Sequence, residues 1–406
     1  MFLQKLKSSS LFKGPQPGAA ASPVIIWFIG FFAFLDVYAI QSILPMIKAD
    51  FDTTATQAGM VVGVTLFAMA AVSPFMGLVS DRIGRKNVLC FALIALTIPT
   101  ALIPLCTNLY LLMLFRFCQG LAVPGIVVVT MAYIAEEFPP TNIARITTAY
   151  VSGTVMGGFS GRFITGHVSD WIGWRGGFLV LAAINLMGVI MVFKHLPPSQ
   201  KFKPSTNFHA GLVTLSHHLK NKRLLAACAV GFCVLYSLVA SFTYINFVLN
   251  HEPFNLSTAG LANVFAVYLI GVFVTPLAGR LISKLGSQRV LIMALVFSSA
   301  GICITLIPSL TVVILGLIIC SSGVFVCQSA SIGFIATNVD EGRSLASGIY
   351  NLSYYSGGAI GAWLAGLAFE AWGWPGSVAS IVAMQCLAIV IAWTCWKPVP
   401  AKTLAS

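Results

Sequence analysis

Three ionisable residues lie inside stretches of sequence that are otherwise apolar. Asp36 stands in "FFAFLDVYAIQSILP", Arg116 in "RFCQG" and Arg162 in "GGFSGRFITG". Charges at membrane depth are costly and by default mark ion or substrate pathways, usually with a partner. We therefore predict proton coupling at Asp36 and Arg116, and binding of an anionic substrate at Arg162 and Arg116.

Two other interpretations of these charges stay open. Asp36 could form a structural ion pair with Arg116 or Arg162. That pair is compatible with coupling, because a carboxylate that exchanges an arginine partner for a proton is a coupling device. Arg116 lies roughly 10 Å from the outer end of its segment at 1.5 Å per residue, so its long side chain could instead extend to the interface.

Polar residues in both halves of the chain are candidates to line a central cavity, although each taken alone fits packing between helices or anchoring at an interface better than ligand contact. The predicted substrate-binding residues, besides the two arginines, are Tyr38, Gln41, Gln119, Tyr236, Tyr244, Gln328, Asn351 and Tyr354. Tyr150, Asn246, Tyr268 and Tyr355 are further candidates of the same kind.

No catalytic constellation stands out. The chain has no GxxxxGK[ST] phosphate loop, no GxSxG elbow and no HExxH pair,. All ten cysteines fall inside predicted helices and none forms a CxxC pair, which favours packing over disulfides or metal binding,. We expect no enzyme activity, no cofactor and no metal site.

The elements that carry these residues must be membrane-spanning helices. The chain has 406 residues, of which 58% are hydrophobic and only 8% charged, so it cannot cover a soluble globule, and lipid excludes open sheet edges. Segments of about 20 apolar residues occur at 24–47, 57–80, 88–106, 109–134, 145–168, 176–196, 224–249, 257–281, 288–307, 310–336, 343–368 and 375–396. The predicted fold class is an all-α integral membrane protein with twelve spans.

The distribution of positive charge orients these helices. Of the 23 Lys and Arg residues, only Lys48 and Arg175 fall in loops on the predicted outer side. Positive charge accumulates on the cytoplasmic side, so we predict a multi-pass protein of the plasma (inner) membrane with both termini cytoplasmic. The net charge of +12 then needs no nucleic-acid partner. The expected partners are the bilayer, protons and a small molecule, and we expect a monomer.

The longest connection divides the spans six and six, and the two halves repeat each other. "VSPFMGLVSDRIGRKNVL" at 72–89 aligns without gaps with "VTPLAGRLISKLGSQRVL" at 274–291, and 157–178 aligns with 357–378. Duplicated halves are typical of secondary transporters. The predicted organisation is a tail at 1–22, a six-helix bundle at 23–196, a basic linker at 197–223, a second bundle at 224–397 and a tail at 398–406.

The string "GLVSDRIGRK" joins two spans by a very short charged turn. With the repeat and the topology, it resembles the signature loop of the major facilitator superfamily, and the resemblance covers essentially the whole chain. In that family the loop locks the halves together on the cytoplasmic side in the outward-open state. The latch residues that the resemblance implies are Gly77, Asp81, Arg82, Gly84 and Arg85, and Glu136 and Arg145 are expected to add salt bridges there. The second copy has Ser283 where the first has Asp81, so the latch is weighted to the first copy.

Two further strings refine the resemblance. "RFCQG" is similar to a family motif implied in proton coupling or substrate binding. Gly153, Gly157 and Gly161 mark a smooth stripe where a second helix can approach closely,. The antiporter motif usually placed there has Gly-Pro at its centre, whereas this chain has Gly161 and Arg162. Arg162 and "MAYIAEEFPP" look like the arabinose-efflux-permease-like or drug-efflux branch.

These features predict a secondary transporter that exports a small organic solute in exchange for protons. The alternative is import of an organic anion by symport or facilitated diffusion. The duplicated half separates fold from function at Arg162, because Gly157, Gly161 and Gly166 recur 200 residues later whereas Arg162 becomes Ala362. Arg162 is therefore a site residue that the shared fold does not require.

Overall fold

The computed structural model describes residues 21–199, 218, 220–338 and 343–396, and within those ranges every regular element is a helix. The first half contains α2 (Pro23–Leu35), η2 (Ala39–Ile43), α3 (Leu44–Asp50), α4 (Ala55–Ile83), α5 (Arg85–Leu102), η3 (Ile103–Leu105), α6 (Leu109–Glu137) and α7 (Pro140–His195). The second half contains α9 (Lys222–Leu249), α10 (Thr258–Val264), η4 (Phe265–Leu269), α11 (Ile270–Leu285), α12 (Ser287–Ile304), α13 (Leu310–Asn338) and α14 (Arg343–Cys395).

The described helices divide into twelve spans, as predicted. Nine helices are long and apolar enough to cross a membrane, and the bent pair formed by α2 and the segment Ala39–Asp50 makes a tenth span. α7 has 56 residues and would be about 84 Å long if it were straight, far more than the hydrocarbon core of about 30 Å. α7 is in fact two helices that meet at Gly173, and α14 is two that meet at Gly373, where the backbone is not helical.

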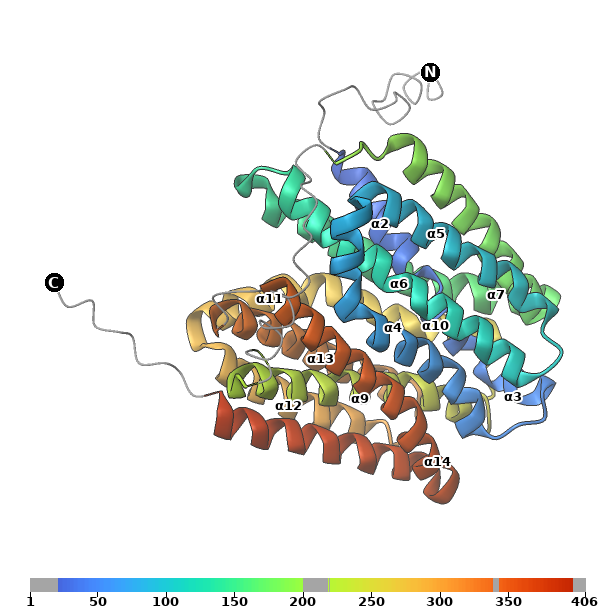
Figure 1. Cartoon of the computed structure of the whole chain (residues 1–406). Helices are drawn as coiled ribbons and strands as arrows, with labels where there is room; N and C mark the ends of the chain where they lie inside the picture. The colour runs from blue at the N-terminus through green and yellow to red at the C-terminus, as the bar shows by residue number, and fades with distance from the viewer. Residues whose placement is uncertain (1–20, 200–217, 219, 339–342, 397–406) are drawn as a thin grey trace, which may run out of the picture.

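Glycines at four turns make the duplication visible in the backbone. Gly84 and Gly286 separate α4 from α5 and α11 from α12, with φ of 95° and 82°. Gly173 and Gly373 divide α7 and α14, with φ of 76° and 64°. Positive φ is strained for residues that carry a Cβ atom, so the same chemistry fixes the same turn in each half. The two halves pack as separate bundles, the first above the second in Figure 1.

The predicted glycine stripe is a close helix crossing. A Cβ atom added at Gly157 or Gly161 would clash with the carbonyl oxygen of Phe31 or Leu35, so α7 lies directly against α2. In the second half, a Cβ atom at Gly357 would clash with the Phe232 carbonyl oxygen, which brings α14 equally close to α9. Small residues permit such close approach between helices in membranes, and this expectation is confirmed in both halves.

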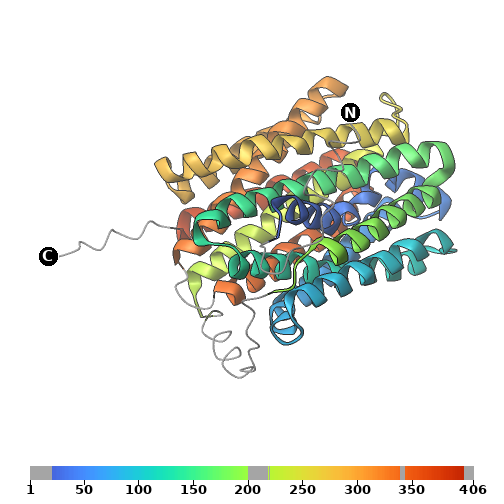
Figure 2. The same cartoon turned by 90° about the horizontal axis from the view of Figure 1, so that it is seen from above.

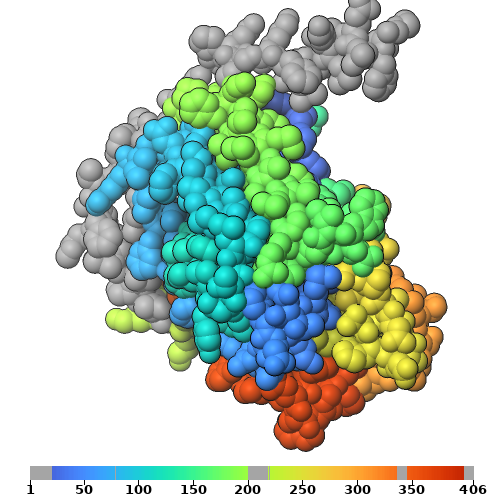
Figure 3. Space-filling view, turned by 90° about the vertical axis from the view of Figure 1, so that its right-hand side faces the viewer, coloured from blue at the N-terminus to red at the C-terminus, as the bar shows by residue number. Residues whose placement is uncertain are grey.

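The helices run between the same two ends of the molecule (Figures 1 and 2). We call the end with the turns at Gly84 and Gly286 the basic end, because Arg82, Arg85 and Lys284 gather there. We call the other end, with Trp174 and Trp374 beside the breaks in α7 and α14, the tryptophan end. At the tryptophan end, blue α3, yellow residues before α10 and red α14 lie against one another without a hollow (Figure 3).

Some expectations lie outside the described residues. These are the N-terminal tail up to residue 20, most of the basic linker and the C-terminal tail at 398–406. Cys106 was expected inside a helix, but it lies in the connection between η3 and α6.

Candidate functional site

Arg162 lies in the middle of the molecule with no exposed surface. Its Nε and Nη2 atoms donate hydrogen bonds of 2.8 and 2.6 Å to the same oxygen, Oε1 of Gln41. Its Nη1 atom donates to the carbonyl oxygen of Gly158 at 2.8 Å, one turn earlier on α7. The side chain has left the glycine stripe and is directed toward the second half, as the 100° turn per residue of a helix predicts.

Three aromatic rings surround the Arg162 guanidinium. Its central carbon lies 4.6 Å from the ring centroid of Tyr38, 4.7 Å from that of Phe265 and 4.3 Å from that of Tyr268. Tyr38 belongs to the first half, whereas Phe265 and Tyr268 lie on η4 of the second half. We call these four residues the Arg162 cage. Faces of aromatic rings attract cations, so the cage holds a charge at the boundary between the halves.

The positive charge of Arg162 has no acidic partner in this arrangement. The ion pairs of the described residues join Arg85 to Asp81 and Glu136, and Arg175 to Asp50, all away from the cage. The contacts of Arg162 are therefore an amide oxygen, a backbone carbonyl and three rings, all of them neutral. A buried charge without a counter-charge is expensive, and the site would be stabilised by an anion.

Asp36 is fully buried where α2 ends. Its Oδ2 atom accepts a hydrogen bond of 2.5 Å from Nδ2 of Asn185, on the second helix of α7, and its Oδ1 atom has no hydrogen-bond partner. Neither arginine forms an ion pair with the carboxylate in this conformation. The proposed Asp36–arginine pair is thus absent here, although Arg116 is a close neighbour.

Arg116 contacts the backbone of the bend that begins at Asp36. Its Nη1 atom donates to the Asp36 carbonyl oxygen at 2.8 Å and its Nη2 atom to the Val37 carbonyl oxygen at 2.5 Å. Nη1 also donates to Oε1 of Gln119 at 2.7 Å, and Gln119 donates to the Thr100 hydroxyl at 2.7 Å. Arg116 has no exposed surface, so it does not extend to the interface. It is the donor to the Val37 carbonyl oxygen at the break and a second donor to the Asp36 carbonyl oxygen, which also accepts from the N–H of Ala39,.

Both clusters depend on irregular backbone. The first span is interrupted between α2 and η2, which carries Gln41, and the eighth is interrupted by η4, which carries Phe265 and Tyr268. Irregular backbone at membrane depth is tolerated where protein or a water-filled cavity satisfies it, and in transporters such breaks mark binding sites. The two breaks meet at Arg162.

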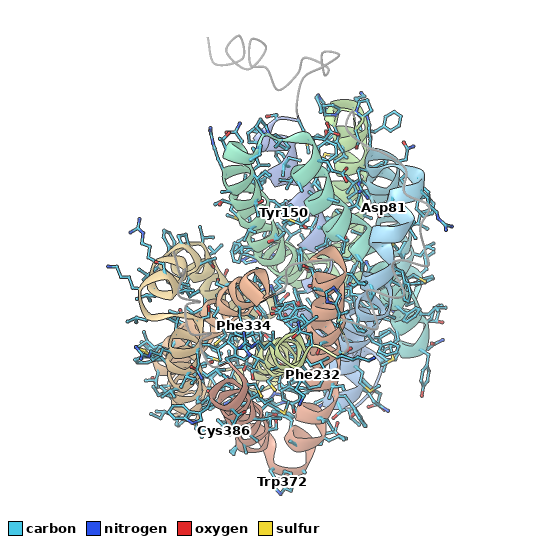
Figure 4. The ribbon with its side chains drawn as sticks, turned by 60° about the vertical axis from the view of Figure 1, so that its left-hand side comes forward. Asp81, Tyr150, Phe232, Phe334, Trp372 and Cys386 are labelled. Atoms are coloured by element: carbon cyan, nitrogen blue, oxygen red, sulfur yellow. The ribbon has the colours of Figure 1, made fainter. Side chains whose placement is uncertain are left out.

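Other predicted substrate residues lie at different distances from the cage. Tyr354 is buried and stacks on Tyr350, with ring centroids 5.7 Å apart, and it is within electrostatic range of Tyr38 and Tyr268. Tyr150, labelled in Figure 4 on the first half, has a buried hydroxyl without a hydrogen-bond partner. Tyr354 adds a second-half ring near the cage, whereas Tyr150 packs against Gly30 of α2 within the first half.

The remaining candidates have a different environment. The Tyr244 hydroxyl donates to the Ala362 carbonyl oxygen, and its ring stacks on Phe369 at 5.6 Å. The Tyr236 backbone packs against Gly361. These contacts join α9 to α14 and do not involve the Arg162 cage. Gln328 and Asn351 are half-buried, and their role in substrate binding stays a prediction.

Three of the predicted latch residues, Arg85, Asp81 and Glu136, meet at the basic end. Arg85 forms ion pairs with Asp81 at 2.6 Å and with Glu136 at 2.5 Å. Gly84 supplies the positive φ of the turn, and Gly77 accepts a hydrogen bond from Ser80 through its carbonyl oxygen. Arg82 and Arg145 are exposed and form no ion pair among the described residues. The ion pairs seen at this end lie within the first half.

Sequence reasoning missed several residues that complete these clusters. Asn185 binds Asp36, Thr243 accepts a hydrogen bond of 3.1 Å from Gln41, and Phe265 faces Arg162. Asn185 has a signal in the sequence, since it is a lone amide in the apolar stretch "LVLAAINLMGVIMV". Phe265 is one of 29 phenylalanines and has none.

Comparison with known proteins identifies one protein family over most of the chain. The family model described as "Major Facilitator Superfamily" matches residues 26–361 and 251–405. The inner membrane transport protein YnfM of Escherichia coli is 33% identical over 363 residues, 89% of this chain and 87% of that protein. An uncharacterized transporter of Buchnera aphidicola from Schizaphis graminum is 32% identical over 364 residues, 89% of this chain and 88% of that one.

The fold also matches a solved structure, although the sequences have diverged. A bacterial homologue of the human lysosomal transporter Spinster, in an inward-facing and unoccupied conformation, superposes with a TM-score of 0.77 at 16% identity, covering 93% of this chain and 98% of that chain. Among more distant relatives, the hexuronate transporter of Bacillus subtilis is 24% identical over 298 residues, covering 68% of this chain and 70% of that one.

Proposed function

Because the chain belongs to the Major Facilitator Superfamily, we propose that this membrane transporter is a proton-coupled carrier of a small organic anion, which binds at Arg162. Alternating access of the two halves would expose the site to each side of the membrane in turn.

The observation that carries the proposal is the uncompensated charge of Arg162. The guanidinium is buried, its hydrogen-bond acceptors are neutral, and the nearest rings are neutral as well. The Nε and Nη2 atoms both converge on one amide oxygen of Gln41. A carboxylate fits the same edge of a guanidinium with two parallel, charge-assisted hydrogen bonds, so an anion would gain more at this edge than the amide does.

Asp36 is the residue proposed to carry the coupled proton. Its carboxylate is buried, it accepts one hydrogen bond from Asn185, and its second oxygen has no partner. A proton removes the cost of a buried charge. Arg116 would act as a positioning residue, because it fixes the backbone on which Asp36 and Gln41 both lie.

The orientation in the membrane is part of the proposal. The basic end would face the cytoplasm, with both termini on that side, because positive loops stay inside. The inner membrane is the proposed location, supported by the similarity to the inner membrane transport protein YnfM. The boundaries of the bundles at residues 196 and 224, and a monomeric state, remain our predictions.

Two directions of transport are open to this site. Export in exchange for protons is the first candidate, in line with the resemblance to the efflux branch. Import of an organic anion is the second. The similarity to the hexuronate transporter supports an organic acid as the substrate, because such an acid would suit Arg162.

The test begins with thermal unfolding of the purified protein in the presence of glucuronate, benzoate, gentisate and matched neutral sugars. Ligands that bind the folded state raise the melting temperature. We expect a carboxylate to stabilise the wild type and to lose its effect in Arg162→Ala. Stabilisation by a neutral or cationic solute that survives in Arg162→Ala would contradict the proposal.

The stabilising carboxylate is then loaded into proteoliposomes under pH gradients of either sign. Movement against its own gradient, driven by protons moving the opposite way, establishes exchange. Movement together with protons establishes symport. A rate that ignores both gradients would remove the coupling part of the proposal.

A further inference from the structure

The Arg162 cage lies on a boundary along which the molecule can part. Arg162 and the η2 segment form one unit within the first half, since the Ser42 hydroxyl donates to the Arg162 carbonyl oxygen at 2.9 Å and the Thr165 hydroxyl donates to the Ala39 carbonyl oxygen at 3.0 Å. Tyr38 and Gln41 lie on the same stretch. These groups would therefore move together with α7.

The other two cage rings belong to an aromatic cluster of the second half. Phe265 and Tyr268 pack against Phe242 of α9, with ring centroids 5.7 and 4.5 Å apart, and Tyr268 also packs against Phe325 of α13 at 5.9 Å. This cluster holds η4 to its own half. Separation of the halves would take Phe265 and Tyr268 away from Arg162 while leaving each half intact.

Other contacts also join the halves near this level and toward the tryptophan end, above all the packing of α4 on α14, where a Cβ atom at Gly63 would meet Ala359 and Ala362. The amide of Gln41 donates to the Thr243 hydroxyl at 3.1 Å, and the backbone N–H of Thr56 donates to Oε1 of Glu370 at 2.9 Å. A Cβ atom at Gly166 would clash with the side chain of Ala262. These are single neutral hydrogen bonds or packing contacts, with one charged acceptor, whereas the cage engages a full positive charge with two rings of the opposite half.

We propose that the Arg162 cage is the gate of the tryptophan end. While that end is closed, Phe265 and Tyr268 cover the guanidinium. When it opens, Arg162 keeps Tyr38 and Gln41, loses the two rings of the second half and faces the open side. The carboxylate of the transported anion would then replace the rings beside Arg162, a step that rests on the proposed function. The Arg162 guanidinium would therefore contact either these two rings or the anion, but not both at once.

Hydrogen–deuterium exchange of the purified full-length chain, without any added solute, tests the gate. The readout is deuterium uptake in peptides that cover residues 36–43 and 258–269. A desolvated cation–π contact contributes about 2 kcal/mol, so Tyr268→Leu should raise the exchange rate there by roughly 10-fold or more. Tyr268→Phe keeps the ring and should exchange like the wild type. Peptides around Gly84 and Gly286, at the other end, should not change.

Phe247→Leu is the matched control, because Phe247 is a buried ring of the same half that packs against Phe369, at 6.0 Å, and not against Arg162. It should leave exchange at 36–43 and 258–269 unchanged. Phe265→Leu provides a second cage variant should Tyr268→Leu fail to yield a monodisperse protein.

The Arg162→Ala, Tyr268→Leu double variant separates a cage from simple packing. If the ring acts through the charge, the double variant should exchange no faster than Arg162→Ala alone, because the effects of coupled residues do not add. Unchanged exchange in both ring variants, an equal rise in Phe247→Leu, or additive effects would each overturn the gate. These measurements involve no anion, so a failed carboxylate screen would contradict the proposed function and leave this result standing.

Discussion

The two halves of this transporter have the same backbone arrangement but different buried side chains. α6 and α13 each have 29 residues, α5 and α12 each have 18, and the turns at Gly84 and Gly286 have the same positive φ. The contacts of Gly157 with Phe31 and of Gly357 with Phe232 place α2 and α9 in equivalent positions. Residues of one half can therefore be compared with residues of the other.

At equivalent positions, the charges of the first half are replaced by neutral residues in the second. Asp36 corresponds to Ser237, Arg116 to Leu317 and Arg162 to Ala362, and all six are buried. Among the described residues, α9 to α14 bury no Asp, Glu, Lys or Arg. The second half instead supplies the rings of Phe265 and Tyr268. The glycines common to both halves therefore serve the fold. The first half alone provides the buried charge of Arg162, and the second half provides aromatic rings that pack against it.

The largest effect is expected at Arg162. In Arg162→Ala the transport rate should fall by about 100-fold, because charge-assisted hydrogen bonds of about 3 kcal/mol are lost. Arg175→Ala is the control, since Arg175 is 44% exposed and its ion pair with Asp50 stays within the first half. Its rate should remain within about 2-fold of wild type, as expected for an exposed pair. Equal losses in proteoliposome transport would show that Arg162 is merely structural.

A change of pH dependence is expected at Asp36. Asp36→Asn keeps the shape and a hydrogen-bonding group but cannot exchange a proton, so the response of transport to a pH gradient should disappear while expression is kept. Ser237→Ala, at the equivalent position of the second half, should retain the gradient response. Initial rates at several external pH values measure both. An unchanged pH profile in Asp36→Asn would remove the coupling role.

The shared scaffold should respond equally in the two halves. Gly157→Ala and Gly357→Ala each force a Cβ atom against a backbone carbonyl, and overpacking typically costs about 1 to 3 kcal/mol. Both variants should therefore melt several degrees below the wild type. Gly279→Ala, where no atom lies within 4 Å of the added Cβ, should be neutral or slightly stabilising. Tolerance of alanine at only one of the two crossings would break the equivalence of the halves.

The smallest effect is expected at the latch. Arg85→Ala removes ion pairs with Asp81 and Glu136, whose side chains are about a third exposed, and we expect the free energy of unfolding to fall by roughly 1 kcal/mol. Ser287→Ala, the equivalent change in the second half, should have no measurable effect on thermal unfolding. A comparable loss in both would show that the second turn has a latch of its own.

Much of the fold follows from local chemistry that is visible in the sequence. The signals for this fold are local: runs of apolar residues, a repeat between the halves and a stripe of glycines can each be read from neighbouring residues. The twelve spans in two halves that they predict are confirmed. The site depends on contacts between distant segments. An ion pair of Asp36 with Arg116 or Arg162 was one open interpretation, but Arg116 instead donates to backbone carbonyl groups of the same bend. The ring of Phe265 reaches Arg162 from a helix about 100 residues away in sequence.

By itself, the sequence predicted that Asp36, Arg116 and Arg162 lie within membrane-spanning segments, because each stands in an apolar stretch long enough to cross the hydrocarbon core. It also led us to predict that Arg162 has a role beyond the shared fold, since the second half has Ala362 at the equivalent position. Only the tertiary structure decided which groups meet these charges. Packing between broken helices brought Gln41, Tyr38 and Tyr268 to one guanidinium, and no local pattern encodes a meeting of three separate elements.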